Sequence, residues 1–308
     1  MSEKTTWPDL PLAAWSGTCD TLQLWTQVVG KVRIALTPLV NHWWNATFFV
    51  TGRGLVAPAM PYAGRTLDVI FDFVDHRLII ETSDGRVESF ALEPMAVADF
   101  YAKFMQRLHR LGIDVHIWTM PSEIEGAIPF EQDRTHRQYD RVYVERFWHA
   151  LVQANRVFTD FRARFIGKAS PVHFYWGGLD LAVTRFSGRT APPLKGETPN
   201  VAKWVMDEAY SHEVSSCGFW PGNGGYGRAA FYVYAYPEPA GYGDTRLKTA
   251  AASYEKNLGQ FILPYDAVRQ AHDPDALLLG FLQETYEAAA ELAKWDRKAL
   301  ERQSVRTV

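Results

Sequence analysis

Four residues capable of acid–base chemistry lie in one stretch of the chain, between residues 170 and 220. His173 and Asp180 belong to two neighbouring strand-like runs rich in aromatic residues, and His212 and Glu213 belong to a third. Ionisable groups in such apolar runs must be partnered or functional, because burying an unpaired charge is costly. A histidine exchanges protons near neutral pH, and a carboxylate can orient it or act as the base itself. These four are therefore the predicted catalytic residues.

Large aromatic residues and one arginine accompany these groups and could bind a ligand. Side chains alternate along a strand, so His173 and Tyr175 share one face, and the tyrosines of residues 231–236 also line one face. Helices should cover the aliphatic face of the sheet, which leaves the tyrosine face to line a cavity or to form an exposed interface. An arginine could hold an anionic group through two hydrogen bonds. The predicted substrate-binding residues are Tyr175, Trp176, Arg185, Tyr210, Trp220 and Tyr234.

Motifs that would name a reaction are absent from the sequence. No His-Glu-x-x-His or Cys-x-x-Cys spacing occurs, so no metal ligands are predicted, although His42, His173 and His212 could converge through the fold. Residues 222–227 are glycine-rich but lack the lysine of a phosphate-binding loop, and no Gly-x-Ser-x-Gly elbow is present. The cofactor is therefore unknown, and each histidine could instead have a structural role.

The candidate residues depend on helices and strands that the hydrophobic pattern predicts. Apolar residues at helical spacing predict helices over about 21–36, 94–111 and 141–165, and a last helix from residue 273. Runs rich in aromatic and β-branched residues predict strands at 42–51, 67–74, 78–82, 87–92, 113–118, 172–176, 179–186, 212–219, 231–236 and 260–263. Asp84-Gly85 predicts a hairpin turn between two of them, because this pair favours positive φ angles.

The predicted elements divide into two similar halves. Each half runs from a helix through several mainly antiparallel strands to another helix, and His42-Trp43-Trp44 in the first half resembles His173-Phe174-Tyr175 in the second. We predict an α+β fold with an N-terminal half over residues 1–119, a connector over 120–140 and a C-terminal half over 141–308 that carries the site. An internal duplication would explain the similarity, and a cleft is expected where the halves meet.

The composition is that of an ordinary globular protein and limits the partners to expect. The 308 residues carry a net charge of −3, and 14% of them are aromatic. The sequence has no basic face or tail and no apolar run approaching about 20 residues, so neither nucleic acid nor a membrane is an expected partner. The N-terminus lacks an apolar signal region, which predicts a cytoplasmic protein. Two cysteines, Cys19 and Cys217, make no disulfide framework.

Four segments carry a resemblance to a known family. They are Leu24-Trp25-Thr26-Gln27-Val28-Val29-Gly30-Lys31, Phe71-Asp72-Phe73-Val74-Asp75-His76-Arg77-Leu78, Ser170-Pro171-Val172-His173-Phe174 and Ala209-Tyr210-Ser211-His212-Glu213-Val214. With these segments, the chain from Trp7 to about Trp295 resembles a bacterial family known only as a domain of unknown function. The resemblance implies family membership and transfers no activity, so the site rests on the residues themselves.

Together these observations favour a soluble protein that binds a small molecule, and more specifically an enzyme with a His/Glu/Tyr cluster in an aromatic cleft. The class of reaction is left open. The alternative is a non-catalytic interaction or oligomerisation protein, in which the aromatic sheet face contacts a partner chain, for example in a homodimer.

Overall fold

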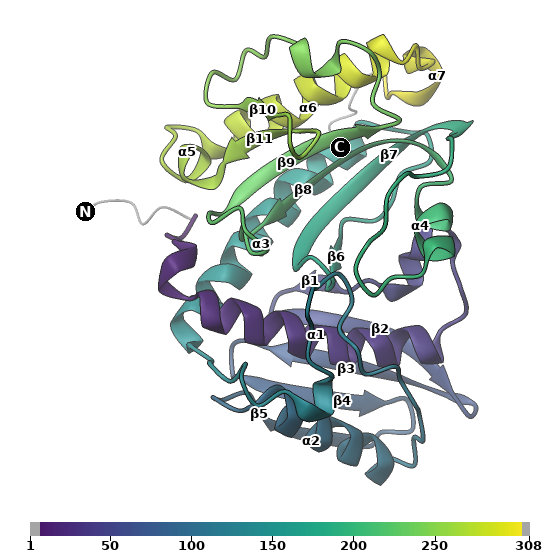
Figure 1. The fold of residues 1–308 in the computed structure, drawn as a ribbon, viewed down its shortest axis with the longest axis vertical. Coiled ribbons are helices and arrows are strands. Elements are labelled where there is room, and N and C mark those ends of the chain that lie inside the picture. The colour runs from purple at the N-terminus through teal and green to yellow at the C-terminus, as the bar shows by residue number, and fades with distance from the viewer. Residues whose placement is uncertain (1–6, 304–308) are drawn as a thin grey trace.

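Two antiparallel sheets form the framework of the chain (Figure 1). The computed structural model describes residues 7–303. The first sheet has the order β1-β2-β3-β4-β5, with bounds Phe49–Thr51, Gly54–Tyr62, Arg65–Asp72, Arg77–Thr82 and Val87–Ala91. The second has the order β10-β11-β9-β8-β7-β6; in chain order from β6 its strands are His173–Tyr175, Asp180–Thr190, His212–Trp220, Ala230–Tyr236, Ser253–Glu255 and Gln260–Pro264. The predicted α+β fold is confirmed.

Helices pack on both sheets. Their bounds are α1 Ser16–Leu36, α2 Val97–Arg110, α3 Arg141–Ala163, α4 Lys203–Ala209, α5 Tyr265–Arg269, α6 Pro274–Leu292 and α7 Arg297–Leu300. Aspartate side chains cap the N-termini of α3, α6 and α7. The Asp140 carboxylate caps α3 by accepting from two backbone amides, and Asp273 caps α6 directly before Pro274. Among residues 7–303, no helix combines the length and the apolar character that crossing a membrane requires.

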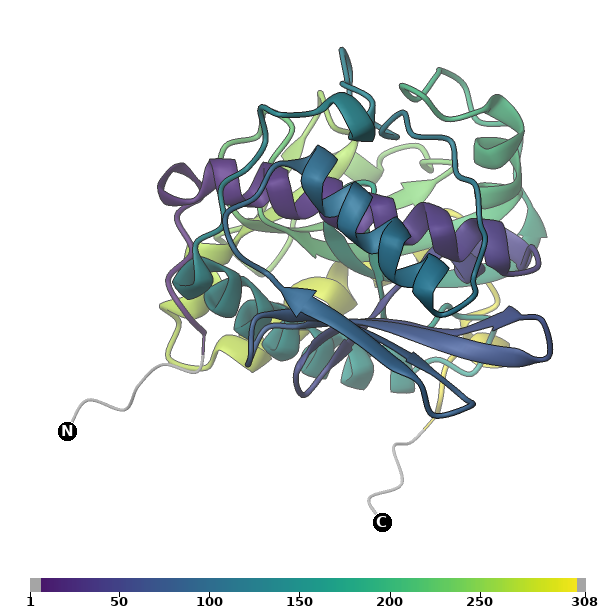
Figure 2. The same cartoon turned by 90° about the horizontal axis from the view of Figure 1, so that it is seen from below.

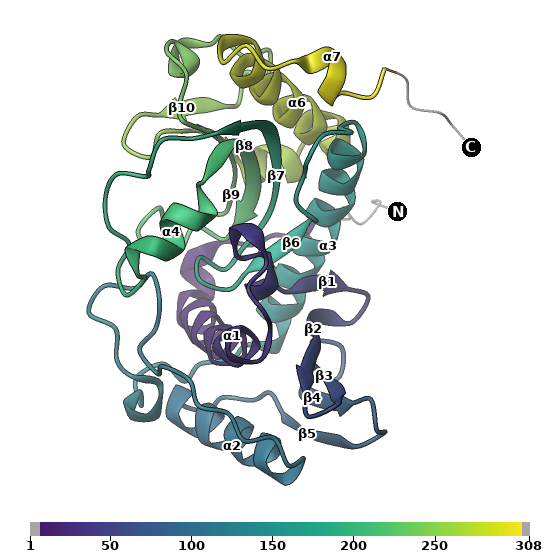
Figure 3. The ribbon, with the colours of Figure 1, turned by 90° about the vertical axis from the view of Figure 1, so that its right-hand side faces the viewer.

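Helix α1 occupies the centre of the molecule. Figure 2 shows α1 and α2 side by side over one face of the first sheet, and Figure 3 shows α1 end-on between the two sheets. Trp25 of α1 stacks on Phe100 of α2 with ring centroids 4.8 Å apart, and Phe100 in turn stacks on Phe71 of β3. Trp25 is fully buried, so this aromatic stack fixes the position of α1 relative to the first sheet.

The two sheets meet where their first strands approach each other. Phe48, just before β1, forms an antiparallel bridge with Phe174 of β6, and their backbone N–H···O distances are 2.9 and 2.7 Å. Both rings are fully buried. The sheets differ in the number and order of their strands, and the internal duplication stays a prediction.

Helix α3 covers one face of the second sheet and leaves the other face free. Phe147 of α3 lies 6.3 Å from Phe174 and 6.4 Å from Phe219, and Phe158 lies 6.3 Å from Phe231, between ring centroids. Because strand side chains alternate, Asp180, Ala182 and Thr184 of β7 and Tyr232 and Tyr234 of β9 belong to the opposite face. That face carries the candidate site.

Several predicted elements were wrong, for identifiable reasons. The predicted strand at 42–51 is a 3₁₀ segment, η2 (Asn41–Ala46), followed by the short β1, because His42 and Trp43 adopt left-handed backbone angles with φ of 59° and 61°. Residues 113–118 form no regular element. Strand β2 was not predicted, since Pro58 and Pro61 interrupt its pattern; the register shift between Ala57 and Met60 accommodates the first of them. The short α4 was not predicted either, and α1 begins at Ser16, before the expected start near residue 21.

Candidate functional site

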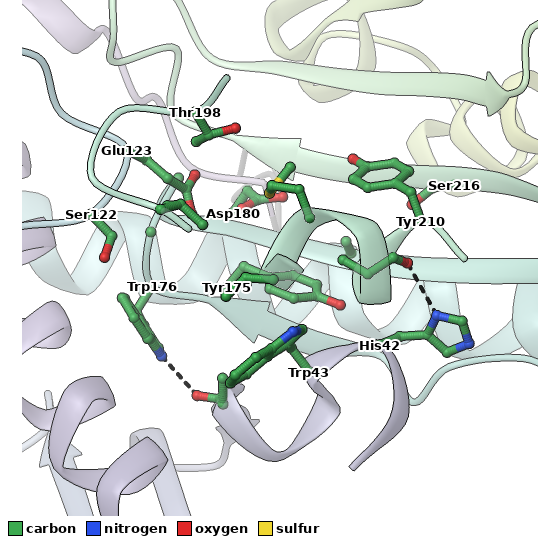
Figure 4. Close-up of a pocket in the computed structure, with 18 of the residues that line it drawn as sticks. His42, Trp43, Ser122, Glu123, Tyr175, Trp176, Asp180, Thr198, Tyr210 and Ser216 are labelled. Carbon is green, nitrogen blue, oxygen red and sulfur yellow. Dashed lines mark hydrogen bonds between the residues drawn. The ribbon is translucent and has the colours of Figure 1, made fainter. Parts of the chain in front are cut away.

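A cavity of about 700 Å³ opens over the free face of the second sheet (Figure 4). Strands β7, β8 and β9 form its floor. Its walls come from η2, α4 and β6 and from the loops around residues 118–123, 198–202 and 220–224. This volume lies within the range of sites that enclose small organic molecules.

Two carboxylates, Glu123 and Asp180, converge in this cavity from different segments of the chain. A Cβ atom placed on Gly178 would lie 3.0 Å from Asp180 Oδ1 and 4.0 Å from Glu123 Oε2, and one placed on Gly177 would lie 2.6 Å from Glu123 Cδ. The absence of side chains at both glycines therefore makes room for the Glu123 carboxylate to approach Asp180, as Figure 4 shows.

The loop that carries Glu123 is held by hydrogen bonds to two neighbouring segments, helix α1 and the loop of residues 199–200. The Gln27 side-chain amide of α1 donates to the Ser122 carbonyl and accepts from the Ser122 amide, at 3.0 and 2.8 Å. The Glu123 amide donates to the Pro199 carbonyl at 2.7 Å, and the Asn200 side chain donates to the Ile124 carbonyl at 3.1 Å. Glu123 itself has a φ of +65°. A glutamate held in this sparsely populated conformation is typical of a functional position.

Four tyrosines and Asp180 form a connected group in the cavity. The Tyr232 hydroxyl donates to Asp180 Oδ2, and the Tyr232 ring stacks on Tyr234 with centroids 6.2 Å apart. The Tyr234 and Tyr210 hydroxyls lie 3.0 Å apart, and Tyr175 pairs across the strands with Asp180. The cavity therefore has an aromatic interior that carries hydroxyl groups.

Gly218 allows Tyr232 to reach Asp180. Gly218 lies between Ala182 and Tyr232 in the register of β7, β8 and β9. A Cβ atom at position 218 would lie 2.6 Å from Tyr232 Cε1 and closer still to the end of the ring. The ring therefore crosses over the glycine toward β7, and any side chain at position 218 would displace it.

The pKa values of both carboxyl groups are raised. Burial raises the pKa of Asp180 to about 6, although the hydrogen bond from Tyr232 acts in the opposite direction. The Glu123 side chain is exposed to the cavity, but protein atoms surround its carboxyl group. This desolvation and, to a smaller extent, the negative charge of Asp180 raise the pKa of Glu123 to about 7. Because each charge disfavours the other, the two groups titrate as a pair, and the free protein holds a proton between them near neutral pH.

Tryptophans and a histidine form the rest of the wall. The Trp176 indole donates to the Ala46 carbonyl at 2.7 Å, and the Trp220 indole donates to the Asn223 carbonyl at 3.3 Å. Trp118 is 61% exposed at the edge of the cavity. His42 Nδ1 donates to the Ala209 carbonyl at 3.1 Å, and Nε2 lies 2.6 Å from the Lys168 ammonium. Burial lowers the pKa of His42, so this ring is neutral in the free protein at neutral pH.

Six of the ten predicted site residues line the cavity: Asp180, Tyr175, Trp176, Tyr210, Trp220 and Tyr234. His173 does not line it, but lies on the same sheet face beneath the wall. His173 is fully buried, and its Nδ1 lies 3.0 Å from the Thr47 hydroxyl. The Trp44 ring lies edge-on to it. Burial lowers the pKa of His173 to about 3, which makes it a neutral structural group.

The other three predicted residues lie outside the cavity lining. His212 stacks edge-on to His42 at 5.5 Å. Glu213 accepts hydrogen bonds from Ser187 and Arg189 on the outside of the sheet. Arg185 is buried in the core, where its guanidinium lies 3.5 Å from the Phe161 ring centroid and 4.2 Å from that of Tyr286. Burial lowers the pKa of Arg185 to about 10. An anionic substrate group in the cavity cannot reach it.

Sequence reasoning missed several residues of the cavity, above all Glu123. The others include Gln23, His42, Trp43, Trp118, Ser122, Asn200, Ser216 and Tyr232. Tyr232 belongs to the alternating tyrosine face that the sequence predicted, and this pattern could have identified it. Glu123 lies in the irregular connector, where no periodicity signals its orientation. Among residues 7–303, no group of three or more His, Cys, Asp and Glu side chains could hold a metal ion.

The fold and site define an α+β protein with a carboxylate pair in an aromatic-lined cavity. The chain belongs to the family of unknown function DUF5996, whose profile matches residues 7–302. No curated protein and no solved structure matched the chain in searches of both.

Proposed function

We propose that the protein binds a small organic molecule in this cavity and is an enzyme that moves a proton on it. Glu123 and Asp180 are the acid–base pair of this proposal, and they replace the predicted His173, His212 and Glu213. Tyr175, Trp176, Tyr210, Trp220 and Tyr234 keep their predicted role as the binding surface. One observation supports the proposal most strongly: two carboxyl groups of raised pKa face the same aromatic-lined cavity.

The chemistry follows from the way in which the pair shares a proton. Near neutral pH one carboxyl group is protonated and can donate, while the other is ionised and can accept. Efficient proton transfer requires groups whose pKa values lie near the working pH, and values of about 6 and 7 satisfy this condition. The Tyr232 hydroxyl stabilises the ionised form of Asp180, which favours Asp180 as the base and Glu123 as the acid.

A ligand and turnover screen with four variants tests this proposal. Water-soluble metabolites are screened by thermal shift on the wild type, and each stabilising compound is then followed by NMR for conversion. We expect at least one compound to be converted, and Glu123→Gln and Asp180→Asn each to lower the rate by about 10²-fold or more, as the loss of an acid or base does.

Glu125→Gln is the matched control. It removes the same charge from the same loop, but Glu125 is exposed and does not line the cavity, so the rate should stay unchanged. Conversion that persists in the Glu123→Gln/Asp180→Asn double variant would contradict the proposed role of the pair.

A further inference from the structure

The charges that line the cavity are of one sign. Among the described residues that line it, Glu123 and Asp180 are acidic, His42 is the single histidine, and there is no lysine or arginine. Such a lining repels phosphates and carboxylates and attracts positive charge. Because no cation compensates the two carboxylates, a bound ligand can supply the missing charge.

Two lysines, Lys31 and Lys168, contact residues that line the cavity. The Lys31 ammonium donates to the Ser122 hydroxyl at 3.1 Å and lies 4.8 Å from the centroid of the Trp118 ring. The Lys168 ammonium contacts His42 and lies over the Phe186 ring at 4.7 Å. Neither lysine forms an ion pair with Glu123 or Asp180 among the described residues.

Aromatic rings surround the carboxylate pair. Tyr175 pairs across the strands with Asp180, and Tyr232 donates to it. The Trp220 ring lies 5.8 Å from that of Tyr232, and all three rings line the cavity. The faces of such rings attract ammonium groups, most strongly when the site excludes water. Carboxylates beside aromatic faces form a site that suits an organic cation better than a hydrated metal ion.

We propose that the ligand of this cavity is an organic cation, an amine or quaternary ammonium compound with an apolar body, whose nitrogen lies between Glu123 and Asp180. The inference rests on the proposed function, since it concerns the same two carboxylates. The volume of about 700 Å³ leaves room for an apolar body against Trp43, Trp176 and Tyr210. The ammonium group balances the negative charge that the pair carries once one of its carboxyl groups is ionised.

This balance of charge makes binding depend on pH. The titratable groups that face the pair are Tyr175, Tyr210, Tyr232 and Tyr234, which remain neutral because their pKa values are raised, mainly by burial and by one another's charge. His42 lines the cavity, Lys31 contacts Ser122 beside Glu123, and Lys168 contacts His42. Below pH 6 both carboxyl groups are protonated and the cation is weakly bound. Because the cation favours the ionised carboxylates and so lowers their pKa values, affinity rises between pH 5 and 8, and binding near pH 6.5 releases part of a proton.

Isothermal titration calorimetry with matched probes tests the inference. The cations are 2-phenylethylamine and choline, and their neutral counterparts are 2-phenylethanol and 3,3-dimethylbutanol; 3-phenylpropionate serves as the anion. We expect each cation to bind at least tenfold more tightly than its neutral counterpart, and the anion not to bind. Titrations near pH 6.5 in buffers of different ionisation heat should show proton release.

The variants separate failure of this inference from failure of the proposed function. Glu123→Gln with Asp180→Asn should abolish the preference for cations, while Glu125→Gln should keep it. Equal affinity of cation and neutral counterpart, a preference that survives in the double variant, or no binding of either cation at millimolar concentration would overturn the inference. A neutral compound that the wild type converts through Glu123 and Asp180 would also overturn it, and would leave the proposed function intact.

Discussion

Replacing Asp180 by asparagine should stabilise the protein at alkaline pH. Asp180 lies half-buried in the cavity, and burial raises its pKa from 3.8 to about 6. A folded-state pKa above the unfolded value means that the native protein binds more protons between these values, so stability falls as pH rises through them. The full loss of stability is reached once the Asp180 carboxyl group is ionised in the folded protein, above about pH 7. The difference of roughly 2 pKa units corresponds to about 3 kcal/mol, at about 1.4 kcal/mol per unit.

Asparagine removes this cost and preserves the local contacts. Its side chain has nearly the same shape, and its carbonyl oxygen can still accept from Tyr232. Asp180→Asn should therefore raise the free energy of unfolding by up to about 3 kcal/mol at pH 8, and the gain should decrease toward zero near pH 4. Such a gain is large compared with the roughly 5–15 kcal/mol that is typical of the free energy of unfolding of a whole domain.

Urea unfolding at a series of pH values between 4.5 and 8 measures this difference. The free energy of unfolding is extrapolated to zero denaturant for the wild type, Asp180→Asn and the Glu125→Gln control at each pH. The control should show no pH-dependent gain, because Glu125 is exposed. A destabilised Asp180→Asn variant, or a difference that does not change with pH, would refute the argument that burial raises the pKa of this group.

Three further predictions concern neighbouring residues. Gly218→Ala should displace the Tyr232 ring and lower the free energy of unfolding by about 1–3 kcal/mol. Gly52→Ala is the control: its added Cβ meets nothing within 4 Å, so the free energy of unfolding should change little. Urea unfolding of both variants measures the difference. His173→Gln should reduce the dependence of the free energy of unfolding on pH below neutrality. Because the pKa of His173 is lowered to about 3 in the folded protein, the wild type loses about 2 kcal/mol of stability between pH 6.5 and 5, as the histidine of the unfolded chain takes up a proton. An unchanged slope in the variant would exclude this explanation. Arg185→Ala should lower the melting temperature, because the guanidinium is packed in the core. At a temperature where the variant is folded, its affinity for 2-phenylethylamine, measured by calorimetry, should equal that of the wild type. A loss of affinity would place Arg185 in the binding site.

Local pattern was sufficient to predict much of the second sheet. Residues 179–186 and 231–236 alternate between core and cavity positions, and β7 and β9 form there as expected. Asp180 was assigned to a candidate site as an ionisable group in an apolar run, and Tyr234 as a member of the alternating tyrosine face. Arg185 shows the limit of the same reasoning. The same alternation places Arg185 on the face opposite Asp180, and that face packs against Phe161 and Tyr286 in the core, so the predicted binding role was wrong.

Long-range contacts determine the parts of the site that the sequence did not predict. Glu123 reaches the cavity because Gln27, 95 residues before Ser122, holds the neighbouring peptide, and because Pro199 accepts from its amide. Neither contact has a local signature. His42 was expected in a strand, but its left-handed backbone turns η2 across the edge of the second sheet, where Trp44 helps to cover His173. The predicted histidine was therefore on the correct face but beneath the surface of the cavity.

The central claim is that Glu123 and Asp180 form one coupled proton-binding site, and carbon-13 NMR titration of their carboxyl groups tests it most directly. Protein labelled at the side-chain carboxyl carbons of Asp and Glu is titrated from pH 4 to 9, and the two signals are assigned with Glu123→Gln and Asp180→Asn. We predict that both groups titrate well above the usual range, near 6 and 7, and that removing the charge of Asp180 lowers the pKa of Glu123. Two independent titrations near pH 4 would contradict the account.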